Sequence, residues 1–362
     1  IPDLPEMVAA ALAEKSKKLA VTERIRGPLE EPRNASLEKF ESVFNSEDKD
    51  IPSQAFVRAM RGCNNFCSYC IVPYVRGPEV SRPVGAVLQQ VRRLADEGVK
   101  QITLLGQTIN SYKYRKNGKL YTLADLLEKT AAVEGIEWVK FVTNYPRPEA
   151  YEDILQVMAD VPQVCQYLHM PAQSGSDRIL KKMNRKYSRG QYLDMLAQAR
   201  ETVPGISIAG DFIVGFPSET AEDFAQTVSL VERAGYKNCF VFKYSPRPGT
   251  RGDKNLADDI PEEVKKKRNN HLLSVQEKIS DSIAQSLVGR ELTVLVEGLS
   301  KKPHLNRDES DMPQLIGRTA GEWIVVFNGP ETLSGQFARV RVEKARPLTL
   351  FGRMTNNSGS YR

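Results

Sequence analysis

Short apolar runs alternate along the chain with segments in which apolar residues recur every three or four positions. The short runs predict strands at residues 54–60, 100–105, 138–142, 167–170, 206–214 and 239–242. The spaced segments predict helices at residues 84–95, 123–133, 152–158, 175–183, 191–202 and 219–234. Strands that alternate with helices in this way are typical of a parallel sheet with right-handed crossovers.

Six strand–helix units are two short of the eight that close a full barrel. The pattern therefore predicts an α/β fold with a partial (β/α)6 TIM-like barrel, open on one side to a large substrate. A doubly wound sheet has the same periodicity and remains an alternative. A longer helix is predicted from residue 261, and the basic residues in its first half fit a solvated helix face better than an RNA contact.

After Gly289 the pattern changes to short strand-like segments separated by glycines. These segments lie at residues 292–296, 315–319, 323–327 and 336–342. About five short strands in about 60 residues predict a small antiparallel β-barrel, a fold that often binds oligonucleotides. At the other end, a short amphipathic pattern at residues 5–12 precedes a polar tract without periodicity, which indicates a linker.

Composition narrows the class of protein only a little. Hydrophobic residues make up 41% of the chain and charged residues 27%, as in ordinary soluble proteins. No apolar run approaches the roughly 18 residues that a membrane span needs, and no signal peptide is visible, so we expect a cytoplasmic protein without membrane association. The net charge of +6 is compatible with a nucleic-acid partner but does not require one.

The candidate chemistry lies directly after the first predicted strand, where Cys63, Cys67 and Cys70 form a C-x3-C-x2-C pattern. Thiolates suit an iron–sulfur cluster, and a four-iron cluster held by three cysteines leaves one iron open to a small chelating molecule. Structural zinc needs four ligands, whereas Cys165, Cys239 and the three histidines are far from this loop in sequence. A disulfide would leave one thiol over. We therefore favour a cluster over both alternatives.

Enzymes built on parallel sheets bind their ligands at the carboxyl ends of the strands. Polar, glycine-rich turns follow the other predicted strands at residues 106–112, 143–146, 169–176, 211–220 and 244–250. Each turn alone could be structural, and an isolated His169 is more often a strand-end histidine than a catalyst. Their common location beside the cysteine loop is what suggests a site.

Four stretches together resemble the methylthiotransferase branch of the radical S-adenosylmethionine (SAM) enzymes. They are residues 63–77, 171–177, 211–220 and 244–250. Within that branch, the Asn-Asn pair of the cysteine loop and residues 296–302 are most similar to MiaB-type tRNA methylthiotransferases. The resemblance implies three regions: a linker and tail of an absent N-terminal methylthiotransferase domain at residues 1–50, a radical SAM core at residues 51–287, and a TRAM RNA-binding domain at residues 288–352.

The resemblance also implies the cofactors. Cys63, Cys67 and Cys70 would ligate a [4Fe–4S] cluster whose open iron binds SAM, and one electron would split SAM to give a radical that removes hydrogen from an aromatic C–H. A second SAM would methylate a sulfur on an auxiliary [4Fe–4S] cluster, expected on three further cysteines of the N-terminal domain. This sequence does not supply those cysteines, so we expect it to cleave SAM but not to deliver sulfur.

Two further groups of residues are implied. Candidates for holding SAM or the target base are Tyr69, Gln107, Thr143, Gln173, Asp211 and Tyr244. Candidates for RNA contacts, chosen for charge or aromatic character, are Tyr74, Arg76, Arg247, Lys301, Lys302 and Arg318. The chain departs from the family at Pro78, where arginine is usual, and at Asn144-Tyr145, where Ser-His is usual.

The implied function is addition of a methylthio group to isopentenyladenosine next to the anticodon of tRNA. The implied partners are the tRNA anticodon stem-loop and an external electron donor such as a flavodoxin, and we expect a monomer. Alternatives within the family are threonylcarbamoyl-adenosine in tRNA and an aspartate of a ribosomal protein. A different class, a non-catalytic RNA-binding module with a structural cluster, would not cleave SAM.

Overall fold

A computed structural model describes residues 53–301 and 312–355. The amphipathic pattern at residues 5–12, the predicted linker and Lys302 lie outside the described residues. Within the described part, no helix combines the length and the apolar character that crossing a lipid bilayer would take.

The first unit of the fold is a curved parallel sheet with six strands. They are β1 (Gln54–Arg58), β4 (Gln101–Leu105), β7 (Trp138–Phe141), β8 (Tyr167–His169), β9 (Ser207–Val214) and β10 (Asn238–Lys243). The strands pair in the orders β1-β4-β7 and β8-β9-β10, and a bridge between Val139 and Val164 joins the two halves. Strand order follows chain order without the reversal of a doubly wound sheet, so the predicted partial barrel is confirmed.

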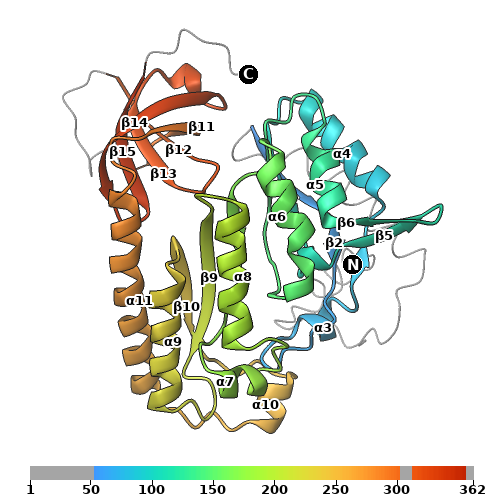
Figure 1. Ribbon diagram of the computed structural model, residues 1–362, viewed down its shortest axis with the longest axis vertical. Coiled ribbons are helices and arrows are strands. Elements are labelled where there is room, and N and C mark those ends of the chain that lie inside the picture. Colours follow the sequence, from blue (N-terminus) through green and yellow to red (C-terminus); the bar gives the residue numbers. More distant parts are fainter. Residues whose placement is uncertain (1–52, 302–311, 356–362) are drawn as a thin grey trace, which may run out of the picture.

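Helices cover the outer face of this sheet (Figure 1). They are α4 (Val84–Asp96), α5 (Leu123–Ala131), α6 (Glu152–Asp160), α7 (Asp177–Lys182), α8 (Arg189–Thr202), α9 (Ala221–Ala234) and α11 (Glu262–Gln285). Local sequence signals start several of them: Ser188 with Gln191 and Thr220 with Asp223 form capping boxes. Gly235 ends α9 in the left-handed conformation that glycine adopts without strain.

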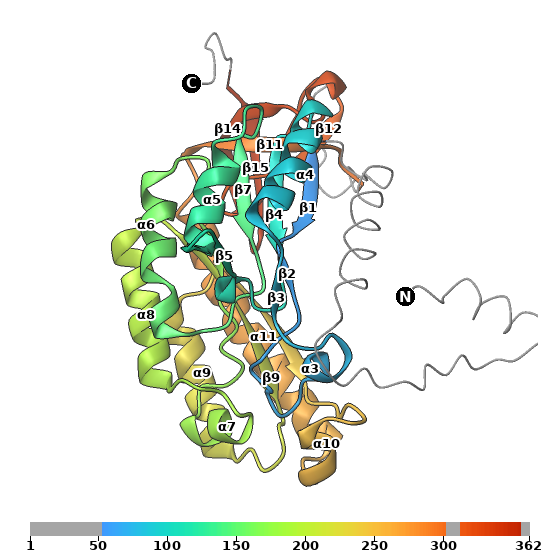
Figure 2. The same ribbon diagram turned by 90° about the vertical axis from the view of Figure 1, so that its right-hand side faces the viewer.

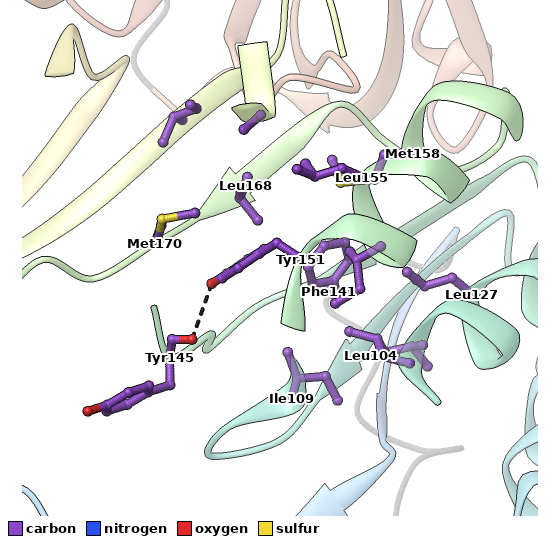
Figure 3. Packing of buried hydrophobic residues seen from close by; sticks show 14 of the residues in the cluster. Leu104, Ile109, Leu127, Phe141, Tyr145, Tyr151, Leu155, Met158, Leu168 and Met170 are labelled. Carbon is purple, nitrogen blue, oxygen red and sulfur yellow. Dashed lines mark hydrogen bonds between the residues drawn. The ribbon is translucent and has the colours of Figure 1, made fainter. Parts of the chain in front are cut away.

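One face of the sheet packs against the helices. Leu104, Phe141 and Leu168 point to that face and are almost completely buried (Figure 3). Each such side chain contributes about 1.5–3 kcal/mol through burial. On the opposite, inner face, Phe56 and Phe240 of the two edge strands are 62% and 54% exposed, so this face is open to solvent at its two edges.

Buried residues also support the loop after β7. Figure 3 shows Tyr151 pointing toward the backbone of Tyr145, to whose carbonyl oxygen it donates a hydrogen bond of 3.4 Å. Asn110 holds the same segment from the other side, since its Nδ2 donates to the Tyr145 carbonyl at 2.7 Å and its Oδ1 accepts from the Tyr145 N–H at 3.0 Å. The core therefore fixes the position of Tyr145, which contributes to the site described below.

A hairpin that the hydrophobic pattern did not predict lies between η1 (Ile109–Ser111) and α5. Its strands are β5 (Lys113–Lys116) and β6 (Lys119–Thr122). Asn117 and Gly118 form the turn with positive φ angles of 49° and 77°. An Asn-Gly turn of this kind is one of the strongest hairpin signals in sequences, but polar strands give no hydrophobic alternation to accompany it.

The second unit is a closed five-stranded barrel, as predicted. Its strands are β11 (Glu291–Leu299), β12 (Gln314–Arg318), β13 (Ile324–Asn328), β14 (Phe337–Arg346) and β15 (Thr349–Met354). They close in the order β11-β12-β13-β15-β14, and the β13–β15 pair is parallel while the others are antiparallel. An odd number of strands cannot alternate in direction all the way around a ring, so one pair has to be parallel.

The five-stranded barrel packs against the amino ends of the core strands, at the opposite end of the molecule from α3 (Val72–Val75), which follows the cysteine loop (Figures 1 and 2). Trp138 at the start of β7 contacts Phe337 with ring centroids 4.8 Å apart. Glu322 forms an ion pair with Lys140, and its backbone carbonyl accepts a hydrogen bond of 2.7 Å from Lys237. The two units are thus joined by apolar packing and by charges with little solvent contact.

Candidate active site

The cysteine loop begins at Gly62, immediately after β2 (Met60–Arg61), which pairs with β3 (Val80–Ser81). Gly62 has a φ of 75°, and a Cβ at this position would overlap the carbonyl oxygen of Pro78. Its backbone N–H donates a hydrogen bond of 2.6 Å to Oε1 of Gln107, which follows β4. Only glycine fits here, and the loop is thereby tied to the carboxyl end of the sheet.

The three thiols are free, and side-chain hydrogen-bond donors face two of them, Cys63 and Cys67. Sγ of Cys63 is 3.2 Å from the Thr108 hydroxyl and 3.3 Å from Nδ2 of Asn65. Sγ of Cys67 accepts from Nη1 of Arg185 at 3.5 Å. Donors directed at sulfur are what thiolate ligands of an iron–sulfur cluster require, because they stabilise the negative charge and adjust the reduction potential.

The sulfur atoms also lie near one another. Burial raises the pKa of the Cys70 thiol, the Val72 N–H opposes this, and the nearby sulfurs of Cys67 and Cys63 raise the pKa further. Among the described residues, no three His, Cys, Asp or Glu side chains are close enough to enclose one metal ion. A cubane takes each thiolate on a different iron, so its ligands are spaced more widely than those of a single ion. The three free thiols of one short loop, with donors directed at two of them, fit a three-cysteine cluster.

Cys165 and Cys239 have a different environment from the loop cysteines. Both are buried core residues, as expected. Burial raises the pKa of Cys165 to about 12 and that of Cys239 well above its ordinary value. Thiols of this kind remain protonated and unreactive, so neither residue joins the three cysteines of the loop.

Arg185 connects the loop to the segment after α7. Its guanidinium carbon lies 4.2 Å from the ring centroid of Tyr145 and 4.9 Å from that of Tyr187. Its Nη2 donates to the carbonyl of Pro171 at 2.9 Å and its Nε to the Tyr187 hydroxyl at 2.7 Å. The stacked and hydrogen-bonded guanidinium places a fixed positive charge beside Cys67.

Replacing Arg185 by lysine is therefore expected to weaken cofactor binding. An ammonium group cannot stack on both tyrosines and donate to both Pro171 and Cys67. We expect about a 10-fold or greater loss of iron affinity, as for other outer-shell substitutions, measured as iron retained against a series of chelator concentrations. Arg200→Lys is the control, because Arg200 donates to the Gly235 carbonyl at 3.2 Å on the far side of the core. Equal iron retention by the two variants would contradict this role.

Three other segments hold the loop in place. The Ser68 N–H donates to the carbonyl of Met183 at 2.9 Å, and the Gly252 N–H of α10 (Arg251–Asn255) donates to the carbonyl of Ser68 at 2.6 Å. Nδ2 of Asn184 donates to the carbonyl of Phe66 at 2.8 Å. Arg147, after β7, donates to Oδ1 of Asn65 at 3.1 Å. The segments that follow β7 and α7, and the start of α10, thus converge on the cysteine loop.

Two of the residues predicted to hold SAM or the base have unusual backbone conformations. Thr143 follows β7 with a φ of 73°, and Gln173 has a φ of 69° where it bridges to Phe212. The left-handed region costs a residue other than glycine about 1–2 kcal/mol. Such strain is concentrated at functional sites, which agrees with a role for both residues, although their contacts with a ligand remain a prediction.

The other candidates for this role are distributed around the same end of the sheet. Oδ1 of Asp211 accepts a hydrogen bond of 2.9 Å from Nε2 of His169, and the strand register puts both side chains on the inner face of the sheet. Tyr69 packs partly buried against the core, and burial raises its pKa well above the ordinary value. Tyr244 is buried against Phe216 with ring centroids 5.0 Å apart. Asp211 therefore has a partner in His169, which sequence reasoning treated as structural.

The candidate RNA contacts separate into three groups. Tyr74, Arg76 and Arg247 are exposed near the cysteine loop, and Tyr74 packs edge-on against Phe66. Lys301 is exposed after β11. Arg318 instead forms ion pairs with Glu297 at 2.9 Å and Glu322 at 3.3 Å, so its guanidinium is already engaged within the protein.

Sequence reasoning missed three residues whose side chains are directed at a cysteine sulfur, namely Asn65, Thr108 and Arg185, and also Arg147, which donates to Asn65. Asn65 and Thr108 belong to stretches that were examined, but nothing in them indicated a side chain directed at sulfur. Arg147 and Arg185 are far from the cysteines in sequence and become visible only in the fold.

Two family models match the chain. The Radical SAM superfamily model matches residues 57–231, and the TRAM domain model matches residues 285–355. Among solved structures, coproporphyrinogen III oxidase (HemN) from Escherichia coli aligns with a TM-score of 0.47 and 15% identity. The alignment covers 92% of this chain and 75% of that one, a likeness too distant to support an assignment by itself.

Similarity to curated proteins is much higher. A tRNA-2-methylthio-N(6)-dimethylallyladenosine synthase from Rhodopirellula baltica is 40% identical over 351 residues, which cover 97% of this chain and 73% of the relative. A protein of the same name from Phocaeicola vulgatus is 44% identical over 332 residues, which cover 88% of this chain and 71% of the relative. The chain, with its three-cysteine loop at the carboxyl ends of a partial barrel, therefore belongs to the tRNA-2-methylthio-N(6)-dimethylallyladenosine synthase family of radical SAM proteins.

Proposed function

We propose that this protein adds a methylthio group to N(6)-dimethylallyladenosine, also called isopentenyladenosine, beside the anticodon of tRNA. The observation that carries the proposal is the loop of Cys63, Cys67 and Cys70 at the carboxyl ends of a radical SAM core, where donors face the sulfurs of Cys63 and Cys67. The relatives with about 40% identity carry the name of this activity. The match to a TRAM domain supports an RNA substrate.

The three cysteines would hold a [4Fe–4S] cluster and leave one iron for SAM. A cluster of this kind supplies the one-electron cleavage of SAM, and with it the means to remove hydrogen from an aromatic C–H. The residues of this chain have simpler tasks. Asn65, Thr108 and Arg185 direct donors at the sulfurs, and Gly62 lets the loop approach Gln107.

The inner face of the sheet would hold the rest of SAM and the target base. Thr143 and Gln173 turn their backbones at the strand ends, while His169 and Asp211 present a hydrogen-bonded pair on that face. The base has to leave its stack to reach them. Sulfur transfer needs a second cluster, and Cys165 and Cys239, which are isolated and buried, do not serve it. We further propose a cytoplasmic monomer that takes electrons from a flavodoxin-like donor.

Mass spectrometry of tRNA nucleosides tests the substrate. Cells without the gene are expected to accumulate isopentenyladenosine and to lose its methylthio derivative, and a copy of the gene should restore it. Loss of methylthio-threonylcarbamoyl-adenosine instead would move the assignment to that tRNA base. Loss of methylthio-aspartate from a ribosomal protein would move it to a protein substrate.

An assay of SAM cleavage separates an enzyme from a non-catalytic RNA-binding module. The protein, reconstituted with iron and sulfide without oxygen, is expected to form 5′-deoxyadenosine when a reductant is added. Absence of this product from protein that retains iron would contradict the enzymatic assignment while leaving RNA binding possible.

A further inference from the structure

The β5–β6 hairpin carries an unbalanced positive charge. Residues 113–122 include Lys113, Arg115, Lys116 and Lys119 and contain no Asp or Glu. All four basic side chains are exposed. Arg115 and Lys116 form no ion pair with any residue that the structure describes, and Lys119 approaches Asp125 only at 3.9 Å. The charge of the hairpin is therefore available to an external anion.

The strand register of the hairpin brings two of these cations close together. Lys116 and Lys119 are directly paired across the two strands, next to the Asn117-Gly118 turn. Like charges directly opposite each other destabilise a hairpin. The neighbouring Arg115 adds a third cation near the tip from the other face, since successive residues of a strand alternate between faces. Such an arrangement is unfavourable for folding alone and suits binding to closely spaced negative groups.

The hairpin is rigidly attached to the part of the fold that holds the cysteine loop. Tyr112, at its base, is buried and donates to the carbonyl of Arg82 at 2.7 Å. The Lys113 N–H donates to the Ser81 hydroxyl at 3.1 Å. The chain that enters the hairpin passes Thr108, which contacts Cys63. Figure 1 shows the hairpin extending from this base away from the helices.

The location of the second unit favours a further RNA contact near the cysteine loop. The TRAM barrel packs on the amino ends of the core strands, and the cysteine loop lies at their carboxyl ends (Figures 1 and 2). An RNA held by the barrel alone would be anchored far from the reacting base. Phosphate contacts determine the register and orientation of a bound nucleic acid, so a basic element on the catalytic side would help Arg76 and Arg247 to orient the base.

We propose that the β5–β6 hairpin binds the phosphate backbone of the tRNA stem-loop whose base is modified, with Arg115, Lys116 and Lys119 as the contacting side chains. This inference rests on the proposed function and adds to it the surface that orients the substrate. Lys116 and Lys119 are brought close together at the tip by the strand register, which lets them contact neighbouring phosphates.

A charge-matched comparison tests the proposal. One variant carries R115Q, K116Q and K119Q, and the control carries R92Q, R233Q and K278Q, which remove the same charge at exposed positions on α4, α9 and α11. Binding of fluorescently labelled tRNA would be measured by anisotropy over a range of salt concentrations. SAM cleavage and thermal unfolding would be measured on the same preparations.

The hairpin variant is expected to bind tRNA about 10- to 100-fold more weakly at low salt. The slope of the logarithm of the binding constant against the logarithm of the salt concentration should become shallower by about two to three. The control is expected to change affinity by less than about 3-fold because it removes no phosphate contact. The melting temperature of the hairpin variant should not fall, since the repulsion between Lys116 and Lys119 is removed. SAM cleavage should remain unchanged.

Three results would overturn the inference, and they differ in what they say about the proposed function. Wild-type affinity in the hairpin variant, or an equal loss of affinity in both variants, would show that the hairpin does not contact the tRNA. The proposed function would then still stand. Weaker binding accompanied by a lower melting temperature would assign the hairpin a structural role. A wild-type protein that does not bind tRNA at low salt would reject the function and the hairpin together.

Discussion

Replacing Cys63, Cys67 or Cys70 by alanine is expected to abolish iron retention and reduce 5′-deoxyadenosine formation to background. Each thiolate of a three-cysteine cluster holds a different iron, so the loss of one leaves a second iron without a protein ligand. The structure adds that donors already face two of these sulfurs, from Asn65 and Arg185. Iron content and product formation in anaerobic preparations would be measured together.

The chain provides its own controls for this experiment. Cys165 and Cys239 are buried core thiols, so alanine at either position should lower the free energy of unfolding by about 1 kcal/mol and leave iron content unchanged. Normal iron content in a Cys67→Ala variant would be incompatible with the proposed cluster. So would equal iron loss in all five single variants, which would indicate misfolding instead of ligand removal.

Replacing Glu322 by glutamine is expected to loosen the TRAM barrel from the core. The Glu322 carboxylate pairs with Lys140, whose side chain is only 3% exposed, and with Arg318 at 3.3 Å. Burial alone would raise the pKa of Glu322, but Lys140, Arg318 and Lys237 outweigh it and hold the pKa below its ordinary value. Without the carboxylate the buried ammonium of Lys140 loses its ion-pair partner, which costs about 3 kcal/mol.

The two tryptophans of the chain report this change directly. Trp138 and Trp323 both lie at the contact between the units and are 8% and 5% exposed. Their fluorescence is expected to shift to longer wavelength at a lower urea concentration in Glu322→Gln than in the wild type. Glu343→Gln is the control, because Glu343 pairs with Arg353 on an exposed surface of the same barrel and contributes less than about 1 kcal/mol. Identical urea midpoints for Glu322→Gln and the wild type would contradict the assignment.

The lowered pKa of Glu322 also predicts how the contact between the barrel and the core depends on pH. Because the pKa of Glu322 is lower in the folded protein than its ordinary value of 4.5, the unfolded state binds more protons below that pH. The stabilisation is complete above about pH 4.5 and is lost as the pH falls through the folded pKa. The wild type is therefore expected to show an acid-induced shift in tryptophan fluorescence, and Glu322→Gln should show a smaller one.

The fold could be predicted well where the signal is local. The period of the apolar residues gave the six strands and the helices of the core, because each element encodes its own buried face within a few residues. The pattern of apolar residues did not predict the β5–β6 hairpin because its strands are polar. Only the Asn117-Gly118 turn indicated it. The parallel pairing of β13 with β15 was not predicted either. It follows from closing a barrel with an odd number of strands and not from the sequence of any one strand.

The site could be predicted only in part. The spacing of Cys63, Cys67 and Cys70 within one loop pointed to a cluster, because ligands this close in sequence can converge without help from the rest of the chain. The partners of the sulfurs could not be predicted in this way. Arg185 is 118 residues from Cys67, and Asp211 is 42 residues from His169.

Local patterns were thus sufficient for the cysteine loop, the alternation of strands and helices, and the presence of a small second barrel. The three-dimensional arrangement was needed to bring Arg185 to Cys67, to pair Glu322 with Lys140, and to show that the barrel and the cysteine loop lie at opposite ends of the core. The reason is physical: contacts between residues far apart in sequence depend on how the sheet curves and how the units pack, and no short stretch of sequence encodes either.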